Sequence, residues 1–91
     1  MNVSAVMNTA LSGMRAQTRR FADVATNVAN ATTPGYTRVD SARPGVETGQ
    51  PMDITAEMTD MIEAKQAYQA NAVMFETGAD FWELLRSVKR D

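Results

Sequence analysis

The stretch NVANATTPGY, residues 27–36, predicts the end of one long helix followed at once by a reversal of the chain. Pro34 cannot continue a helix, and its ring pushes Thr33 toward extended geometry. Pro-Gly suits the two central positions of a type II turn, in which Gly35 supplies the positive φ. We therefore expect a sharp turn directly after a helix.

The two asparagines and the tyrosine of this stretch are expected to complete the helix end. Asn27 and Asn30 share a helix face near its C-terminus, where asparagine adopts capping conformations that other residues resist. Tyr36 is expected to fold back against this end of the helix. The predicted turn motif comprises Asn27, Asn30, Thr33, Pro34, Gly35 and Tyr36.

Upstream of the turn, apolar side chains recur with the period of a coiled coil. A step of alternating three and four residues runs from Val3 to Val28, with one polar interruption at Gln17. A helix is expected to begin near Asn2 or Ser4, either of which is a suitable N-cap. Its large seam residues, spaced by seven, are Met7, Met14, Phe21 and Val28.

Downstream of the connection, a second helix shows the same period. Asp53 is placed as its N-cap after Pro51, and the helix is expected to run to about Val88. Gly78 is expected to be a weak point, because glycine costs up to about 1 kcal/mol against alanine in a helix. The large seam residues, again spaced by seven, are Met61, Tyr68, Phe75 and Trp82.

These patterns predict an all-α fold in which two long heptad-patterned helices form an antiparallel coiled-coil hairpin. The expected organisation is a single domain with an N-terminal helix at 1–30, a turn and connecting loop at 31–52, and a C-terminal helix at 53–91. The Pro- and Gly-containing loop has room for a short β-hairpin at most. Two helices alone leave much of each apolar stripe in water, so we expect the chain to assemble with itself or with a partner.

Composition excludes several classes of function. The 91 residues contain neither cysteine nor histidine, which removes disulfides, thiolate metal sites and the usual proton carrier near neutral pH. We expect no catalytic, cofactor-binding or metal-binding residues and no cofactor. The acidic residues Glu57, Asp60 and Glu63 are interpreted as a solvated helix face rather than as acid–base catalysts, and the protein is not expected to be an enzyme.

The distribution of charge is uneven along the chain. Residues 1–30 carry Arg15, Arg19 and Arg20 against Asp23, whereas residues 53–91 hold eight acids and four bases. Segments of opposite sign suit each other as partners, within one chain or between chains. Three arginines on one helix and a pI near 5.0 argue against nucleic acid. No apolar run is long enough for membrane insertion, and the N-terminus lacks the pattern of a cleavable signal peptide.

Two longer segments resemble the signatures of a known family. SGMRAQTRRFADVATNVANATTPGYTR, residues 12–38, is similar to the N-terminal signature of the bacterial flagellar basal-body rod and hook (axial) proteins. DITAEMTDMIEAKQAYQANAVMFETGADFWELL, residues 53–85, is similar to the C-terminal signature of that family. The connection between them is shorter than the family's usual central excursion, so the chain resembles a short form lacking the central domain.

The resemblance implies a structural role in the flagellum. It implies that the two helices pack with those of neighbouring subunits, itself or other axial proteins, and that the chain is exported through the flagellar type III apparatus to the periplasmic rod. Asn71 matches the second-helix core of the family and is expected to fix the register. The expected assembly interface comprises Met7, Met14, Phe21, Val28, Met61, Tyr68, Asn71, Phe75 and Trp82.

Two other interpretations stay open at this point. One is a small, non-structural helical hairpin that acts as an adaptor or regulator by binding axial or export proteins in the cytoplasm. The other is a generic dimeric coiled coil, which would be fully helical in dilute solution. The flagellar interpretation instead predicts partial helicity that rises with concentration, because the helices are completed by their neighbours.

Overall fold

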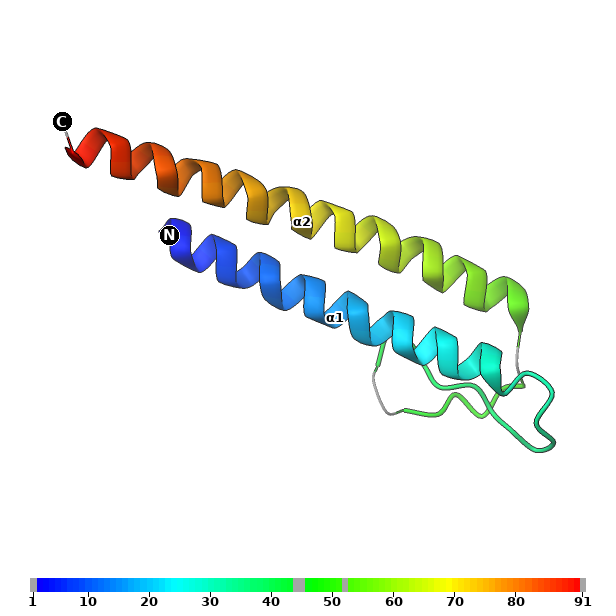
Figure 1. The fold of residues 1–91 in the computed structure, drawn as a ribbon. Helices are drawn as coiled ribbons and strands as arrows, with labels where there is room; N and C mark the ends of the chain where they lie inside the picture. The colour runs from blue at the N-terminus through cyan, green and yellow to red at the C-terminus, as the bar shows by residue number, and fades with distance from the viewer. Residues whose placement is uncertain (1, 44–45, 52, 91) are drawn as a thin grey trace.

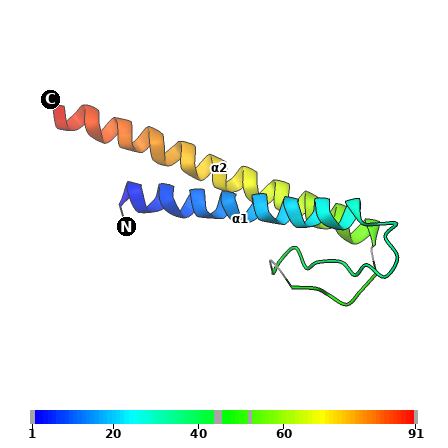
Figure 2. The same ribbon diagram turned by 60° about the horizontal axis from the view of Figure 1, so that its bottom comes forward.

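The structure, a computed structural model of the 91-residue chain, describes residues 2–43, 46–51 and 53–90. It consists of two helices, α1 (Val3–Ala29) and α2 (Ile54–Arg90), which lie side by side and run in opposite directions (Figures 1 and 2). The molecule is a rod with extents of 66 × 19 × 16 Å. The prediction of an all-α hairpin built from two long helices is confirmed. The expected segment boundaries at residues 1, 52 and 91 lie outside the described residues.

Both helices begin at capping side chains, as their sequences lead one to expect. The Asn2 side-chain oxygen accepts a 2.7 Å hydrogen bond from the Ala5 amide, and Asp53 accepts one of 3.0 Å from the Thr55 amide. These contacts satisfy amides that have no partner inside the helix. Asn30 caps the C-terminal end of α1 with φ −101°, so the cap is made without a left-handed backbone.

The chain turns after α1 at Thr33–Tyr36. The Tyr36 amide donates a 3.2 Å hydrogen bond to the Thr33 carbonyl, and Gly35 has φ +74°. A hydrogen bond across four residues with a positive φ at the third position is the geometry of a type II turn. The turn sends the chain back along α1 rather than straight into α2.

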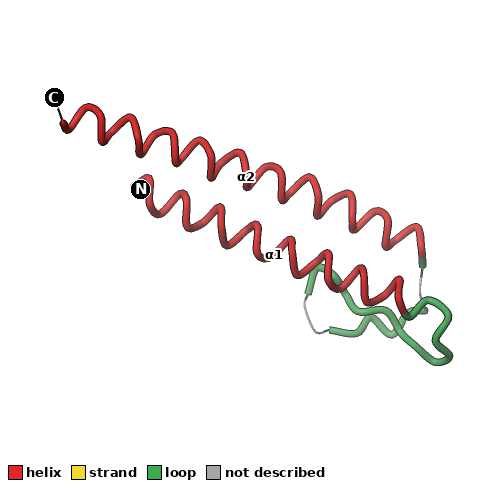
Figure 3. The backbone as a smooth tube through the Cα atoms, viewed as in Figure 1, coloured by secondary structure: helices red, strands yellow, loops and turns green. Residues whose placement is uncertain are grey.

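The connection that follows is folded and lies beside the C-terminal half of α1 (Figure 3). Val39 and Glu47 form an antiparallel bridge, and Arg38 exchanges backbone hydrogen bonds of 2.9 Å with Thr48 and Gln50. Ser41 is almost completely buried. The loop is thus a small hairpin docked on the helices.

The fully buried part of the contact between the helices is made by small and polar residues. The buried apolar side chains are Ala10, Val24 and Ala64. Small side chains let the two helix backbones approach closely, and the glycines show how closely. A Cβ atom added at Gly78 would lie 2.7 Å from the Met7 Cγ atom, and one at Gly13 would lie 2.5 Å from the Asn71 amide nitrogen.

The expectation that Gly78 is a weak point of α2 stays a prediction, and the structure adds a packing role for this glycine. Glycine does cost helix propensity, but here it makes room for the Met7 side chain of the facing helix. The sequence showed the cost at Gly78 and not the close contact that requires it.

The helices differ in length, with 27 residues in α1 and 37 in α2. Because their other ends meet at the connecting loop, the C-terminal end of α2 continues past the beginning of α1 (Figure 1). Trp82, Leu85 and Val88 are all at least half exposed in this projecting part. We refer to the loop end of the rod as the closed end and to the other as the open end.

Candidate functional site

The side chain of Asn27 organises the closed end. It is fully buried and makes four hydrogen bonds to three different parts of the chain. Its oxygen accepts from the Tyr36 hydroxyl at 2.8 Å and from the Val39 amide at 2.7 Å. Its nitrogen donates to the Val39 carbonyl at 2.9 Å and to Glu57 at 3.0 Å. One amide thus joins α1, the turn, the loop and α2.

Glu57, in the first turn of α2, is a residue through which the loop contacts this helix. Its side chain is fully buried, and its Oε1 atom accepts a 2.7 Å hydrogen bond from Arg38 Nε. A buried carboxylate is tolerated only when it is paired and hydrogen-bonded. Arg38 supplies the charge and Asn27 a second donor, while the buried Oε2 atom has no protein partner.

The ion pairs continue along the facing sides of both helices. Arg38 also donates to Asp60 at 3.1 Å, and Arg20 of α1 lies 3.0 Å from Glu63 and 3.7 Å from Asp60. We call this set the polar cluster; its members are Arg20, Asn27, Tyr36, Arg38, Glu57, Asp60 and Glu63.

The interpretation of Glu57, Asp60 and Glu63 as a solvated face is wrong for the first two. Glu57 is fully buried and the Asp60 side chain is 24% exposed, whereas the Glu63 side chain is 58% exposed. Burial follows because the loop lies over the start of α2 and brings Arg38 to these acids. The run of acids in the sequence gave no indication of the loop's path.

The pKa shifts at this end follow from the same contacts. The hydrogen bond to Glu57 raises the pKa of Arg38, which stays charged at every physiological pH. Burial, followed by the nearby carboxylate of Glu57, raises the pKa of Tyr36 above its usual value. Tyr36 therefore holds its proton and donates it to Asn27 in the hydrogen bond described above.

The chemistry of the polar cluster is structural. Within the described residues, no group of three or more acidic side chains is arranged to hold a metal ion. Each charged member points at another member, which fixes the loop on both helices and fixes the start of α2 against the end of α1. The cluster thus sets the geometry of the closed end.

The turn-motif residues lie together at this end, but they contribute unequally. Asn27 and Tyr36 belong to the polar cluster. Asn30 binds the helix end locally, since its side chain donates to the Thr26 carbonyl and accepts from the Thr33 hydroxyl. Pro34 and Gly35 are exposed and shape the turn.

The expected interface residues divide into two groups within the single chain. Met7, Met14, Phe21 and Phe75 are half-buried between the helices, whereas Val28, Met61, Tyr68 and Trp82 are exposed. Asn71 faces Gly13 on α1 and donates a 2.9 Å hydrogen bond to the Ala67 carbonyl of its own helix.

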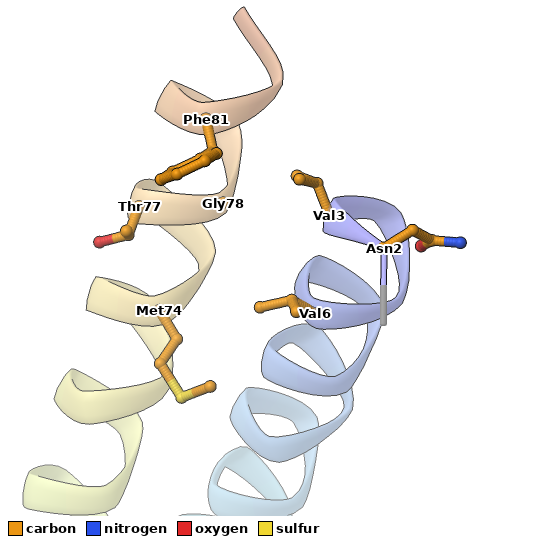
Figure 4. Close-up of a pocket in the computed structure, with 7 residues that line it drawn as sticks. All are labelled: Asn2, Val3, Val6, Met74, Thr77, Gly78 and Phe81. Atoms are coloured by element: carbon orange, nitrogen blue, oxygen red, sulfur yellow. The ribbon is translucent and has the colours of Figure 1, made fainter. Parts of the chain in front are cut away.

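A large exposed apolar surface is the second feature of the candidate site. Of the large apolar side chains that are exposed among the described residues, nearly all lie on α2. Near the open end they border an apolar groove of about 330 Å³ (Figure 4). Val3 and Val6 of α1 form one wall, and Met74, Gly78 and Phe81 of α2 form the other. The exposed set on α2 is Ile54, Met58, Met61, Ile62, Tyr68, Val73, Met74, Phe81, Trp82, Leu84, Leu85 and Val88.

The structure is a two-helix hairpin with a polar closed end and an apolar outer surface, and comparison with known proteins places it in a family. The family model described as "Flagella basal body rod protein" matches residues 7–37. The model described as "Flagellar basal body rod FlgEFG protein C-terminal" matches residues 52–83. The chain belongs to the flagellar rod and hook (axial) family, as its two signatures led us to expect. This family is structural, which confirms the expectation that the chain is not an enzyme.

Individual relatives agree with the family models. The chain is 47% identical over 38 residues to the flagellar hook protein FlgE of Brucella suis, and equally so to those of Brucella abortus and Brucella melitensis. The match covers 42% of this chain but only 10% of each hook protein, so the chain spans a small part of the length of these relatives. No solved structure matches the chain. Neither described helix combines the length and apolarity needed to cross a membrane.

Proposed function

We propose that the chain is a structural subunit of the flagellar basal-body rod, built into the axial structure by coiled-coil packing of both helices against neighbouring subunits. The observation that carries this proposal is the exposed apolar surface of α2. Among the described residues, the fully buried apolar side chains are those of Ala10, Val24 and Ala64, while side chains such as Phe81, Trp82 and Leu84 are at least half exposed.

The energetic imbalance supports assembly. Complete burial of one large apolar side chain stabilises by about 1.5 to 3 kcal/mol relative to exposure. Large exposed apolar surfaces mark interaction sites. Neighbouring helices that cover α2 would therefore supply stabilisation that the isolated hairpin lacks.

Within this proposal the exposed seam residues Val28, Met61, Tyr68 and Trp82 contact neighbouring chains, and Met7, Met14, Phe21 and Phe75 pack in the hairpin. Asn71 helps to hold the register at Gly13. The partners are other copies of this chain or other axial proteins. The chain reaches the periplasmic rod through the flagellar type III export apparatus.

The rival proposal is a non-structural hairpin that binds an axial or export protein in the cytoplasm. The same exposed surface of α2 would serve it, because an adaptor also needs an apolar face for its target. The two proposals differ in where the protein is found and in whether it becomes a permanent part of the flagellum.

The test is to purify hook–basal bodies from cells that express the chain at its native level and to probe them with an antibody. A rod subunit is expected to stay with the basal bodies through detergent and salt washes. An adaptor is expected in the cytosolic fraction and absent from the washed basal bodies, and that result would overturn the proposed function. A known cytosolic flagellar protein serves as the control for contamination.

A further inference from the structure

The open end of the rod has one apolar side that is open to solvent. Phe81 of α2 lines the groove described above, and Val3 and Val6 of α1 lie across from it (Figure 4). Apolar residues that follow Phe81 by three, four and seven positions share its side of α2 and are at least half exposed. We call this surface the open-end face; its members on α2 are Met74, Phe81, Leu84, Leu85 and Val88.

Charged residues are absent from this side of the open end. Between Met74 and Val88, at about 100° per residue, each charged residue lies roughly 100° or more around α2 from Phe81. These residues are Glu76, Asp80, Glu83 and Arg86. On α1, residues 2–14 include no charged residue. The open end of α2 is therefore amphipathic, with an apolar side and a charged opposite side.

Positive charge is concentrated where α2 ends. Residues 53–83 hold seven acids and one base, whereas residues 84–90 hold three bases and no acid. Arg86, one of the three bases, is exposed. A partner that covers the open-end face should therefore offer an apolar interior and a negatively charged border.

From this combination we propose that the open-end face binds the surface of an anionic lipid membrane. An amphipathic helix with bulky apolar residues on one side and bases near its end lies in the plane of such a surface. The apolar side chains enter the boundary between headgroups and acyl chains, and the bases attract the anionic headgroups. Neither described helix crosses the membrane in this arrangement.

A flat surface suits the open-end face better than a protein groove does. Helix-binding grooves enclose the apolar side of a single helix. Here Val3 and Val6 of α1 stand beside Phe81 and close one flank of the face. A lipid surface contacts both helices from the one side that stays open.

The inference goes beyond the proposed function, which concerns contacts between subunits. The exposed seam residues Met61 and Tyr68 lie about 140° to 160° around α2 from Phe81. A chain that lies on lipid by its open-end face therefore keeps this seam free for neighbouring chains.

Vesicle flotation of the full chain tests the inference. At one low protein concentration, the chain is expected to bind vesicles of phosphatidylcholine with phosphatidylglycerol about tenfold more tightly than vesicles of phosphatidylcholine alone. The preference is expected to shrink as the ionic strength rises, because salt screens the attraction.

Two matched double variants test the apolar part of the face. L84Q/V88Q removes two large apolar side chains from the open-end face and is expected to weaken binding to the anionic vesicles by about tenfold. M58Q/I62Q removes two similarly exposed apolar side chains near the closed end and is the control, expected to bind as the original chain does. Circular dichroism checks that both variants keep the same helicity.

Two matched charge changes test the basic part. Arg86→Glu is expected to remove most of the preference for anionic vesicles. Lys65→Glu makes the same change in net charge at an exposed position far from the open end, and is expected to leave the preference nearly intact.

Four results would overturn the inference. They are failure of the original chain to float with anionic vesicles, equal affinity for both vesicle compositions, equal losses from L84Q/V88Q and M58Q/I62Q, and equal losses from Arg86→Glu and Lys65→Glu. Loss of L84Q/V88Q from washed basal bodies without loss of vesicle binding would show instead that the face contacts protein. Detection of the original chain in washed basal bodies does not depend on lipid binding, so the failures of the two proposals are distinguishable.

Discussion

At the scale of single residues, the closed end depends on a few side chains that each hold several elements. Asn27 lies on α1 but binds the loop backbone, Tyr36 and Glu57. Arg38 lies on the loop and binds two acids of α2. Because each partner is shared, removal of one residue releases groups on several elements at once, and the effects of such mutations should not be additive.

The Arg38–Glu57 pair should contribute more to stability than an exposed pair of the same type. Arg38→Ala leaves a buried carboxylate without its counter-charge and is expected to lower the free energy of unfolding by about 3 kcal/mol. Arg43→Ala removes the pair with Asp40, in which the Arg43 side chain is 73% exposed, and is expected to cost less than about 1 kcal/mol. Urea unfolding followed by circular dichroism measures both values. Equal losses would contradict a structural role for the polar cluster.

Tyr36 should give the protein a characteristic alkaline instability. Its pKa is raised in the folded chain, so its contribution to stability is complete below the unfolded value near 10 and is lost as the pH rises through the folded pKa. Tyr36→Phe is expected to lose about 1 kcal/mol at neutral pH, from the missing hydrogen bond to Asn27, and to lack this part of the alkaline decline. Unfolding measured from neutral pH to pH 11 tests the expectation. The exposed Tyr68→Phe should retain the decline.

At the scale of the helices, the sequence was sufficient for their existence and approximate ends. Seven-residue spacing, the N-cap residues Asn2 and Asp53 and the Pro34–Gly35 turn are local signals, and local signals determine where a helix begins and ends. These features depend on neighbours in the sequence and not on how the helices meet.

Which faces of the helices meet was harder to predict. The spacing of the large apolar residues pointed to the seam of Met61, Tyr68 and Trp82. The face of α2 that contacts α1 instead follows a step of three and four residues, and its members are Glu57, Asp60, Ala64, Ala67, Asn71 and Gly78. That signal was present in the sequence, although its residues are small or polar. When a helix has two periodic faces, the sequence pattern does not show which of them packs against the other helix. The position of Arg38 depends on the path of the loop, for which no local pattern exists.

The close approach of the helices at Gly13 predicts an unusual response to alanine. Gly13→Ala adds helix propensity worth about 1 kcal/mol, yet its Cβ atom would meet the Asn71 amide. Overpacking costs about 1 to 3 kcal/mol, so the variant is expected to be less stable on balance. In an Asn71→Ala background the obstacle is gone, and the same change is expected to be neutral or stabilising. Thermal unfolding of the four proteins in this cycle gives the coupling directly, with the exposed Ser12→Ala as control.

A stabilising effect of Gly13→Ala in the original chain would show that the helices can move apart at no cost. Asn71 would then not hold the register at this position. The proposed role of Asn71 in the assembly interface would need another basis.

At the scale of the whole molecule, the stability of the fold should depend on contacts with neighbouring subunits. The rod is 66 Å long and only 16 to 19 Å across, so few side chains lie far from solvent. Small chains bury a smaller fraction of their surface than large ones and often require association. The exposed surface of α2 is where that association would add stability.

Helicity and thermal midpoint are expected to rise with protein concentration over about a hundredfold range, because association is linked to folding by mass action. The fluorescence of the single tryptophan reports on the same association. Trp82 is half exposed in the lone chain, so its emission should move to shorter wavelength as neighbours cover it. A midpoint and an emission maximum that do not depend on concentration would favour the generic coiled coil over an assembling subunit.

The docked loop also offers a place at which a second protein domain can be inserted into the chain. The Val46 amide donates a 3.1 Å hydrogen bond to the Arg43 carbonyl, so the chain leaves and returns at nearly the same point. A guest domain whose own termini are adjacent could be spliced in there, because the loop stem at Arg38 and the polar cluster beneath it would not have to move. An assembly built from such fusions would display its cargo at regular intervals along its length.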